Sequence, residues 1–330
     1  MNFTERRERF RAVLAGDECV YTAPVFDLTS ARLAEQMGFD LGFMTGPVAQ
    51  ATVVGAPNHH VVVMTSTELA QHVGSMCRIT DRLSLYIGAH HGYGNALNVM
   101  RTVQELERVG VSALSIDDEV EPIPFGTRFE SWGDYHTYVQ GGERLISLEE
   151  AVGRMKAAVA ARQDSSLVIV ARTTALRVDA GPPEISDVEE QKDRLSGARG
   201  PDFNPGGIAE AIRRINAYEE AGVDAVHLDG AKFAGLEEIR AETRLPLILG
   251  DEAALFDREF LARNGVRVGG FGRLTYFASV KAIYDTLKAL RDGKSPADLA
   301  PDLYAPEVLE AISDLTRVGQ YDEWIRAFMN

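Results

Sequence analysis

Short runs of apolar residues alternate along this chain with longer segments in which Leu, Ile, Val and Ala recur every three or four positions. Short apolar runs bounded by Gly, Asp or Pro are typical of buried strands, and the longer pattern is typical of amphipathic helices. The predicted strands are Val20–Phe26, Leu41–Thr45, Leu83–Gly88, Ala113–Asp117, Leu167–Arg172, Ala225–Asp229, Pro246–Gly250 and Val266–Gly270. Eight strands that alternate with helices predict an α/β fold, a (β/α)8 barrel of the TIM type.

The helical segments end on clear stop signals. We expect a helix over Ser30–Met37, capped by Thr29 or Ser30, and helices over Asn98–Val109 and Gly207–Ala221 that each end at a glycine. Further helical patterns near the end of the chain cover Tyr276–Asp292, Pro306–Arg317 and Tyr321–Met329.

Two stretches interrupt this rhythm after strand ends. We therefore predict a catalytic barrel over residues 1–290, with loop insertions near 123–144 and 176–205, and a C-terminal helical extension over 291–330. Long loops at this end of a barrel serve either as lids and partner contacts or as solvated insertions, and the sequence leaves both interpretations open.

Composition excludes several classes of function. The 330 residues carry a net charge of −15, which argues against nucleic acid or an anionic membrane as the main partner. No segment has the length of a transmembrane helix, and Met1–Leu14 lacks the apolar core of a signal peptide. Cys19 and Cys77 form no CxxC motif and are expected to be buried hydrophobic residues, so we expect a reducing, cytoplasmic location.

The segment Ile87–Val99 is the most informative for chemistry. Glycines from Gly88 to Gly94 surround His90, His91 and Tyr93, between the end of a predicted strand and the start of a helix. Glycines allow close approach of a ligand to the backbone, and a helix N-terminus favours an anion. The alternative is a tight turn whose histidines face solvent.

Two charged residues end neighbouring predicted strands. Asp117 leads the run of acidic residues in "LSIDDEVEP", where a carboxylate can hold a hard cation or move a proton. Arg172 ends the apolar strand in "VIVARTTA", where its guanidinium needs an anionic partner. That partner is either a substrate carboxylate or a structural aspartate.

Six motifs follow one another along the chain: "FDLTSARLAEQMGFD", "TGPVAQATVVGAP", "GYGNALNVMRTVQELERVGVSALSIDD", "EEAVGRMKAAVAAR", "IVARTTA" and "AYEEAGVDAVHLDG". Through these motifs the chain resembles the isocitrate lyase / phosphoenolpyruvate mutase superfamily over nearly the whole barrel. The resemblance implies a Mg²⁺-dependent barrel that acts on α-keto or 2-hydroxy acids through an enolate. It also implies a C-terminal helix swapped between subunits, in a homodimer or homotetramer.

The resemblance assigns roles to particular residues. Thr45, Gly46 and Pro47 match the turn that binds the substrate carboxylate, and Arg172 matches the arginine that holds the substrate oxygens. Asp117 stands where the family has a glutamate close to the metal. Arg273 replaces a histidine of the oxaloacetate decarboxylase branch and would suit a second substrate carboxylate, although it could equally lie on the surface.

Gly88 and His90 occupy the positions of the family's Asp-x-Asp metal ligands, and Asn58 replaces another aspartate. Three alternatives follow. In the first, the site binds Mg²⁺ weakly through water, Asp117 and substrate. In the second, His90, with Asp117 and His59, His60 or His91, holds another divalent metal such as Zn²⁺, Mn²⁺ or Fe²⁺. In the third, no metal is used, and Arg172 with a histidine stabilises the negative charge of the reacting substrate.

The stretch "EPIPFG", Glu121–Gly126, lacks the cysteine of the superfamily's isocitrate-cleaving lyases and is closer to the oxaloacetate decarboxylase branch. We therefore expect a lyase that acts on a small α-keto di-acid, with His90 or His91 moving the proton and Tyr93 nearby. The alternatives are a specialised retro-aldol lyase, hydrolase or isomerase of secondary metabolism, and a non-catalytic binding or regulatory barrel.

Overall fold

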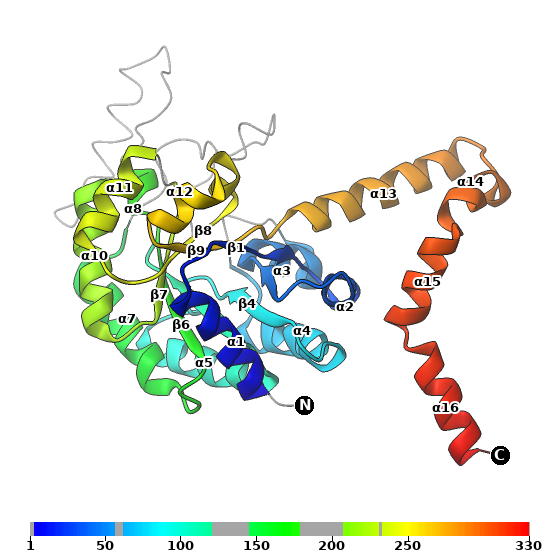
Figure 1. Ribbon diagram of the computed structural model, residues 1–330, viewed down its shortest axis with the longest axis horizontal. Helices are drawn as coiled ribbons and strands as arrows, with labels where there is room; N and C mark the ends of the chain where they lie inside the picture. The colour runs from blue at the N-terminus through cyan, green and yellow to red at the C-terminus, as the bar shows by residue number, and fades with distance from the viewer. Residues whose placement is uncertain (1–2, 57–61, 121–144, 179–206, 231–232, 330) are drawn as a thin grey trace, which may run out of the picture.

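The protein is described from a computed structural model, over residues 3–56, 62–120, 145–178, 207–230 and 233–329. Its centre is a ring of parallel strands surrounded by helices (Figure 1). The strands are β1 (Val20–Tyr21), β2 (Ala23–Pro24), β3 (Leu41–Met44), β4 (Ser84–Gly88), β5 (Ala113–Asp117), β6 (Val168–Thr173), β7 (Ala225–Leu228), β8 (Leu247–Leu249) and β9 (Val266–Gly269).

The predicted barrel is confirmed, and all eight predicted strand positions are occupied by strands. The first predicted strand, Val20–Phe26, is divided in two at Thr22. β1 pairs with β9 and β2 pairs with β3, so this divided segment closes the ring. The Thr22 backbone N–H still donates to Gly269 O at 3.0 Å, which keeps the two halves in one line.

The helices of the barrel layer alternate with the strands. They are α1 (Phe3–Ala15), α2 (Leu28–Gln36), α3 (Gly46–Val54), α4 (Ser66–Ile79), α5 (Ala96–Val109), α7 (Leu148–Ala161), α8 (Ala175–Val178), α10 (Ile208–Ala221), α11 (Phe233–Glu242), η1 (Asp251–Leu255) and α12 (Arg258–Arg263). Six of these described helices, α2, α3, α4, α5, α7 and α12, begin at a side-chain cap. The predicted cap of α2 was wrong. Asp27 caps that helix, and Ser30 is the third helical residue, whose hydroxyl accepts from the Asp27 N–H at 3.0 Å.

Apolar side chains fill the barrel interior and α1 closes its amino-terminal end. Phe10 and Leu14 of α1 belong to the same buried cluster as Phe43, Tyr86 and Ile248 from the strands. Within the described residues, α1 covers one end of the ring, so a ligand reaches the interior from the carboxyl-terminal end of the strands. That end is where active sites of such barrels form.

Both cysteines are buried, as predicted. Burial raises the pKa of the Cys19 thiol to about 11 and that of the Cys77 thiol to about 12. Neither thiol is therefore ionised at neutral pH, and neither has the properties of an activated nucleophile.

After the barrel, α13 (Leu274–Arg291) extends away from the ring, and α14 (Pro296–Leu303), α15 (Pro306–Leu315) and α16 (Val318–Phe328) follow it (Figure 1, orange to red). Arg317, between α15 and α16, donates to Ile79 O at 2.8 Å, so this C-terminal arm touches the barrel again beside α4. In the part of the chain that is described, no helix is long and apolar enough to cross a membrane.

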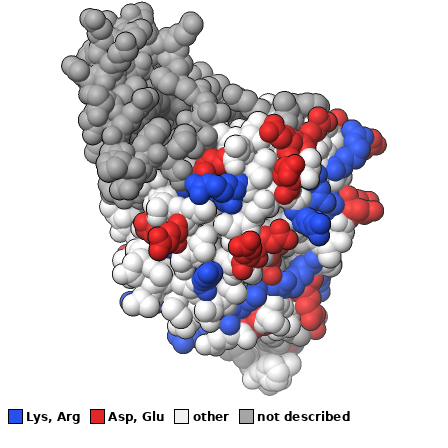
Figure 2. All heavy atoms as spheres, turned by 90° about the vertical axis from the view of Figure 1, so that its left-hand side faces the viewer, with Lys and Arg blue, Asp and Glu red and all other residues white. Residues whose placement is uncertain are grey.

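The insertion predicted near 123–144 lies outside the described residues. Of the insertion predicted near 176–205, only Leu176–Val178 is described, within α8. Acidic and basic side chains are mixed over the coloured part of the face in Figure 2, without a continuous basic surface of the kind that binds phosphodiester backbones.

Candidate active site

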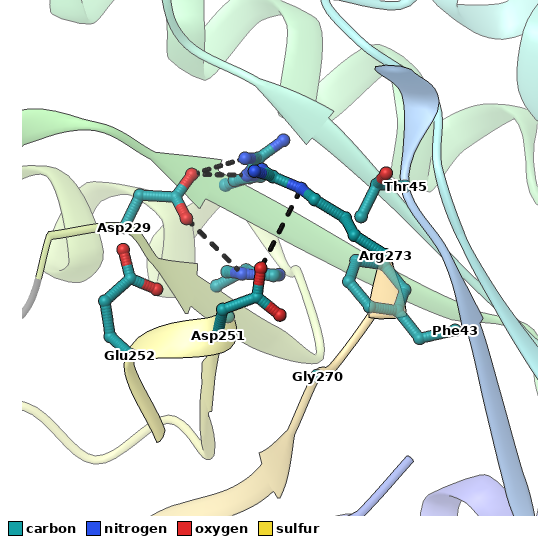
Figure 3. A pocket seen from close by; sticks show the side chains of 10 residues that line it. Phe43, Thr45, Asp229, Asp251, Glu252, Gly270 and Arg273 are labelled. Atoms are coloured by element: carbon teal, nitrogen blue, oxygen red, sulfur yellow. Dashed lines mark hydrogen bonds and ion pairs between the residues drawn. The ribbon is translucent and has the colours of Figure 1, made fainter. Parts of the chain in front are cut away.

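A polar pocket opens at the carboxyl-terminal end of the barrel strands (Figure 3). Its walls come from residues that end β3, β6, β7 and β8, together with the segment between β9 and α13. The lining residues are Phe43, Thr45, Arg172, His227, Asp229, Gly250, Asp251, Glu252, Gly270 and Arg273. Three residues predicted to bind substrate, Thr45, Arg172 and Arg273, therefore share one pocket although they are far apart in the sequence.

Arg172 is held between two carboxylates. Its Nη1 donates to Asp117 Oδ2 at 3.1 Å, and its Nε donates to Asp229 Oδ2 at 2.6 Å. Both aspartates are almost completely buried. The register of the sheet explains the first contact, because Asp117 and Arg172 are paired across β5 and β6. The anionic partners of Arg172 in this structure are thus aspartates, which was one of the two sequence-based alternatives.

Asp118 follows Asp117 directly and points the opposite way. Its Oδ2 accepts from Tyr218 Oη at 2.6 Å and from Arg214 Nη1 at 3.0 Å, between β5 and α10. Successive side chains of a strand face opposite sides of a sheet, so one aspartate faces the barrel interior and the other faces the helical layer. Burial, followed by the nearby Asp118 charge, raises the pKa of Tyr218 well above its usual range, and the phenol therefore donates. Asp118 is a structural residue.

The predicted carboxylate-binding turn packs against the glycine-rich segment. Thr45 caps α3 by accepting from the Val48 N–H at 3.3 Å. A methyl group on Gly88 would lie 2.9 Å from Gly46 N, and one on Gly46 would lie 2.5 Å from His90 Nε2. Glycine at these two positions therefore allows the turn, the strand end and the His90 ring to pack closely.

His90, His91 and Tyr93 are not among the residues that line the Arg172 pocket. His90 is buried with a positive φ of 48°, and its carbonyl accepts from the Asp117 N–H at 2.8 Å. His91 and Tyr93 instead line a second hollow beside Met64, Asn98 and neighbouring residues. Their catalytic roles remain predictions from the sequence.

Sequence reasoning missed His227, which lines the pocket. His227 is buried on β7, with its Nδ1 2.7 Å from Tyr86 Oη and its Nε2 3.7 Å from Asp229 Oδ1. Asp229 was missed too, although it ends a predicted strand as Asp117 does. The same positional rule could have selected Asp229, and two-residue spacing places His227 on the same inward face of the strand.

The acidic wall of the pocket was also unforeseen. Asp251 and Glu252 follow β8 at the start of η1, where Asp251 Oδ2 lies 3.9 Å from Arg273 Nε and Glu252 Oε1 accepts from the Gly230 N–H at 3.1 Å. With Asp229 they place three carboxylates among the lining residues, against the two guanidinium groups of Arg172 and Arg273. The pocket is therefore not a simple cationic anion-binding site.

The donor groups of the described residues do not fit the Mg²⁺ site implied by the resemblance. Gly88 has no side chain to offer, and Asp117 Oδ2 is engaged by Arg172. Within residues 3–56, 62–120, 145–178, 207–230 and 233–329, no three His, Cys, Asp or Glu side chains are placed to hold one metal ion. Asn58, His59 and His60 lie outside the described residues.

Comparisons with known proteins agree with this architecture. The model of the phosphoenolpyruvate phosphomutase family matches residues 10–291. An oxaloacetate decarboxylase of Paraburkholderia xenovorans (strain LB400) is 36% identical over 328 residues, which cover 99% of this chain and 94% of the relative.

Two solved structures have the same fold. A phosphoenolpyruvate phosphomutase from Streptomyces platensis subsp. rosaceus is 25% identical with a TM-score of 0.77, over 98% of this chain and 99% of the other. A phosphonopyruvate hydrolase in complex with oxalate and Mg²⁺ is 22% identical with a TM-score of 0.73, over 98% and 99% of the two chains.

Proposed function

Because this chain belongs to the phosphoenolpyruvate phosphomutase family, we propose that it is a carbon–carbon lyase that decarboxylates a small 2-oxo di-acid of the oxaloacetate type. The observation that carries the proposal is the placement of Arg172 and Arg273 in one pocket at the barrel mouth. One guanidinium group, Arg172, can hold the keto-acid end of such a substrate, and the other, Arg273, can hold its second carboxylate. The oxaloacetate decarboxylase relative, which matches nearly the full length, supports the same substrate class.

The residues of the pocket suit enolate chemistry. Loss of the distal carboxylate as CO2 leaves its electron pair as an enolate, whose negative charge develops on the former keto oxygen. A guanidinium held in advance by two buried aspartates can meet that charge without reorganising, which stabilises the transition state more than the ground state. At the N-terminus of α3 the Gly46 N–H can donate to the other carboxylate, because Pro47 has no N–H and the Val48 N–H donates to Thr45.

The described residues do not fit the family's Mg²⁺ site, and the roles proposed above belong to side chains and backbone groups of this chain. The Asp117 N–H donates to the His90 carbonyl at 2.8 Å, and the role of these two residues as ligands of another divalent metal stays a prediction. The decarboxylation rate is therefore measured both with and without added divalent metal.

The proposal is tested by following oxaloacetate loss and pyruvate formation with the purified protein. Divalent metals decarboxylate oxaloacetate by themselves, so each reaction needs a matched reaction with metal alone. We expect turnover above that blank, and a fall in kcat/KM of about 100-fold or more in R172K, which keeps the charge but loses the planar donor set. Rates equal to the blank with Mg²⁺, with Mn²⁺ and without metal would refute the lyase proposal.

A specialised member of the superfamily with another substrate is the second candidate. Asp251 and Glu252 favour it, because their carboxylates disfavour a second anionic group on the substrate. A panel of 2-oxo acids that share the keto-acid end but carry a carboxylate, an amide or an amine at the other end distinguishes the two. Preference for the amide or the amine would support this candidate over the di-acid.

We also infer that the protein works as a homo-oligomer in which the C-terminal arm packs on a second copy. Helices α13 to α16 contain no buried residues in this single chain, yet they carry many large apolar side chains. Exposed examples are Phe277, Ile283, Leu287, Ile312, Trp324 and Ile325. Apolar surface of this extent is typical of a protein–protein interface. The division of the chain at residue 290 and the cytoplasmic location stay predictions.

A further inference from the structure

His227 occupies the floor of the Arg172 pocket. It is almost completely buried, and it is the histidine among the described residues that lines this pocket. His90 packs against Gly46 and His91 lines the second hollow. His72 lies on α4, where its Nε2 is 2.7 Å from Phe26 O. Among the described residues, His227 is therefore the histidine that lines the pocket of Arg172 and Arg273.

The two nitrogens of His227 have different surroundings. Nδ1 lies 2.7 Å from Tyr86 Oη, on the side of the apolar barrel interior. Nε2 lies 3.7 Å from Asp229 Oδ1. A methyl group on Gly250 would be 3.4 Å from Nε2 and 2.9 Å from Glu252 Oε2, so Glu252 borders the same space. Nε2 therefore faces the acidic wall of the pocket.

These surroundings favour the protonated ring. Carboxylates near Nε2 favour a proton on that nitrogen and a positive charge on the imidazole, and Nδ1–H then donates to Tyr86 Oη. Tyr86 accepts this hydrogen bond as a neutral phenol, because burial raises the pKa of its phenol far above the usual value and keeps it protonated. The ring of Tyr86 is itself fixed by stacking on Phe43, with ring centroids 4.5 Å apart, and by an edge contact with Phe10.

We propose that protonated His227 is the catalytic acid that delivers a proton from Nε2 to the enolate carbon and is left as a neutral ring, and that Tyr86 is a positioning residue that holds Nδ1–H. The proposal rests on the enolate chemistry proposed above. When the bond between C3 and C4 of the substrate breaks, CO2 leaves and the electron pair becomes the C2–C3 double bond of the enolate. C3 then takes the Nε2 proton, the keto group re-forms, and solvent water returns a proton to Nε2.

The reverse of this step gives a test that does not depend on decarboxylation. A group that protonates the enolate of pyruvate also removes a proton from the methyl group of pyruvate, so the protein should exchange these protons in D2O, measured by loss of the methyl signal in ¹H NMR. We expect H227Q to lower the exchange rate by about 100-fold or more. The control H72Q should stay within about fivefold of the wild type, because its ring lies on α4 and does not border the pocket.

Binding of oxalate, a planar mimic of the enolate, is measured on the same proteins by calorimetry. H227Q should bind oxalate within about threefold of the wild-type affinity, since Arg172 and Arg273 remain. Y86F should retain oxalate binding and exchange about threefold to tenfold more slowly, because the ring nitrogens lose their fixed roles. If H227Q does not fold, Y86F tests the proposal by itself. A wild-type rate of proton exchange in Y86F would contradict the proposal.

Equal exchange by H227Q and the wild type would overturn the role of His227, as would a wild-type protein that does not exchange pyruvate protons. A loss of exchange of about 100-fold in H91Q or H90Q with H227Q unaffected would assign the proton to the glycine-rich turn instead. The protein could also exchange pyruvate protons in a way that depends on His227 and yet fail to decarboxylate oxaloacetate. This result would refute the decarboxylase proposal and support the role of His227 in proton transfer.

Discussion

Two nitrogens of Arg172 converge on a single oxygen of Asp229, with Nε at 2.6 Å and Nη2 at 2.5 Å from Oδ2. The other oxygen of Asp229 lies 3.7 Å from His227 Nε2. One buried carboxylate therefore orients both the cation proposed to hold the substrate and the imidazole proposed to transfer the proton.

D229N tests this double role. The amide keeps the shape of the carboxylate and removes its charge, so Arg172 has one anionic partner fewer and greater freedom to move. We expect kcat for 2-oxo di-acid decarboxylation to fall about 10- to 100-fold through misplacement of Arg172. KM should not rise, because the loss of a negative charge from the pocket does not weaken the binding of an anionic substrate. A raised KM with an unchanged kcat, in steady-state kinetics, would show that Asp229 affects binding alone.

The neighbours Asp117 and Asp118 form a matched pair for separating activity from stability. D117N should lower kcat about 10- to 100-fold, because Asp117 holds Arg172 within the pocket. D118N should lower the free energy of unfolding by about 3 kcal/mol, because it leaves the buried Arg214 without that carboxylate. Urea unfolding and kinetics on both variants check the assignment, and a large loss of kcat in well-folded D118N would count against it.

Because the backbone packs closely at Gly88, we expect the addition of one methyl group there to destabilise the protein. In G88A the new carbon would meet Gly46 N at 2.9 Å, and this backbone atom has no rotamer to relieve the contact. We expect a loss of about 1–3 kcal/mol in the free energy of unfolding, together with lower activity. The control is G153A within α7, where a methyl group meets nothing within 4 Å and should stabilise the helix by about 0.5–1 kcal/mol.

Glu35 predicts a pH-dependent contribution to stability. Burial raises the pKa of its carboxyl group, but N–H donors from Arg82, Leu83 and Asp81 and the Arg32 side chain outweigh burial and lower the pKa below the usual value. A lowered folded-state pKa stabilises the protein above the unfolded-state pKa, and this contribution disappears as the pH falls through the folded value. Urea unfolding of E35Q should show a deficit of about 1–3 kcal/mol at pH 7 that narrows below about pH 4.5.

The C-terminal arm provides a test of assembly. Charges placed on the exposed apolar faces of α15 and α16, as in a double I312E/I325E variant, should reduce the mass measured by light scattering to that of a smaller species. E310Q, also on α15, changes the charge without touching apolar surface and should leave the mass unchanged. A wild-type protein that is monomeric at micromolar concentration would contradict the proposed homo-oligomer.

The sequence by itself determined the barrel. Apolar runs of strand length and glycine stops such as Gly110 and Gly222 reflect local preferences of the backbone and burial, so they can be read without a structure. The same local logic placed Arg172 and Asp117 at strand ends, where a barrel forms its site. It failed at the cap of α2, because Asp27, Thr29 and Ser30 all have cap chemistry and only the backbone conformation selects one.

Only the tertiary structure decided which side chains share a pocket. His227, Asp229 and Arg273 are brought together with Arg172 by the closure of the ring, which no spacing along the chain encodes. The same closure separates His91 from Arg172, although both follow strand ends. The ends of the strands lie on one rim of the barrel, but each side chain points inward or outward according to its position along its own strand. That orientation places Asp117 beside Arg172 and its neighbour Asp118 among the helices.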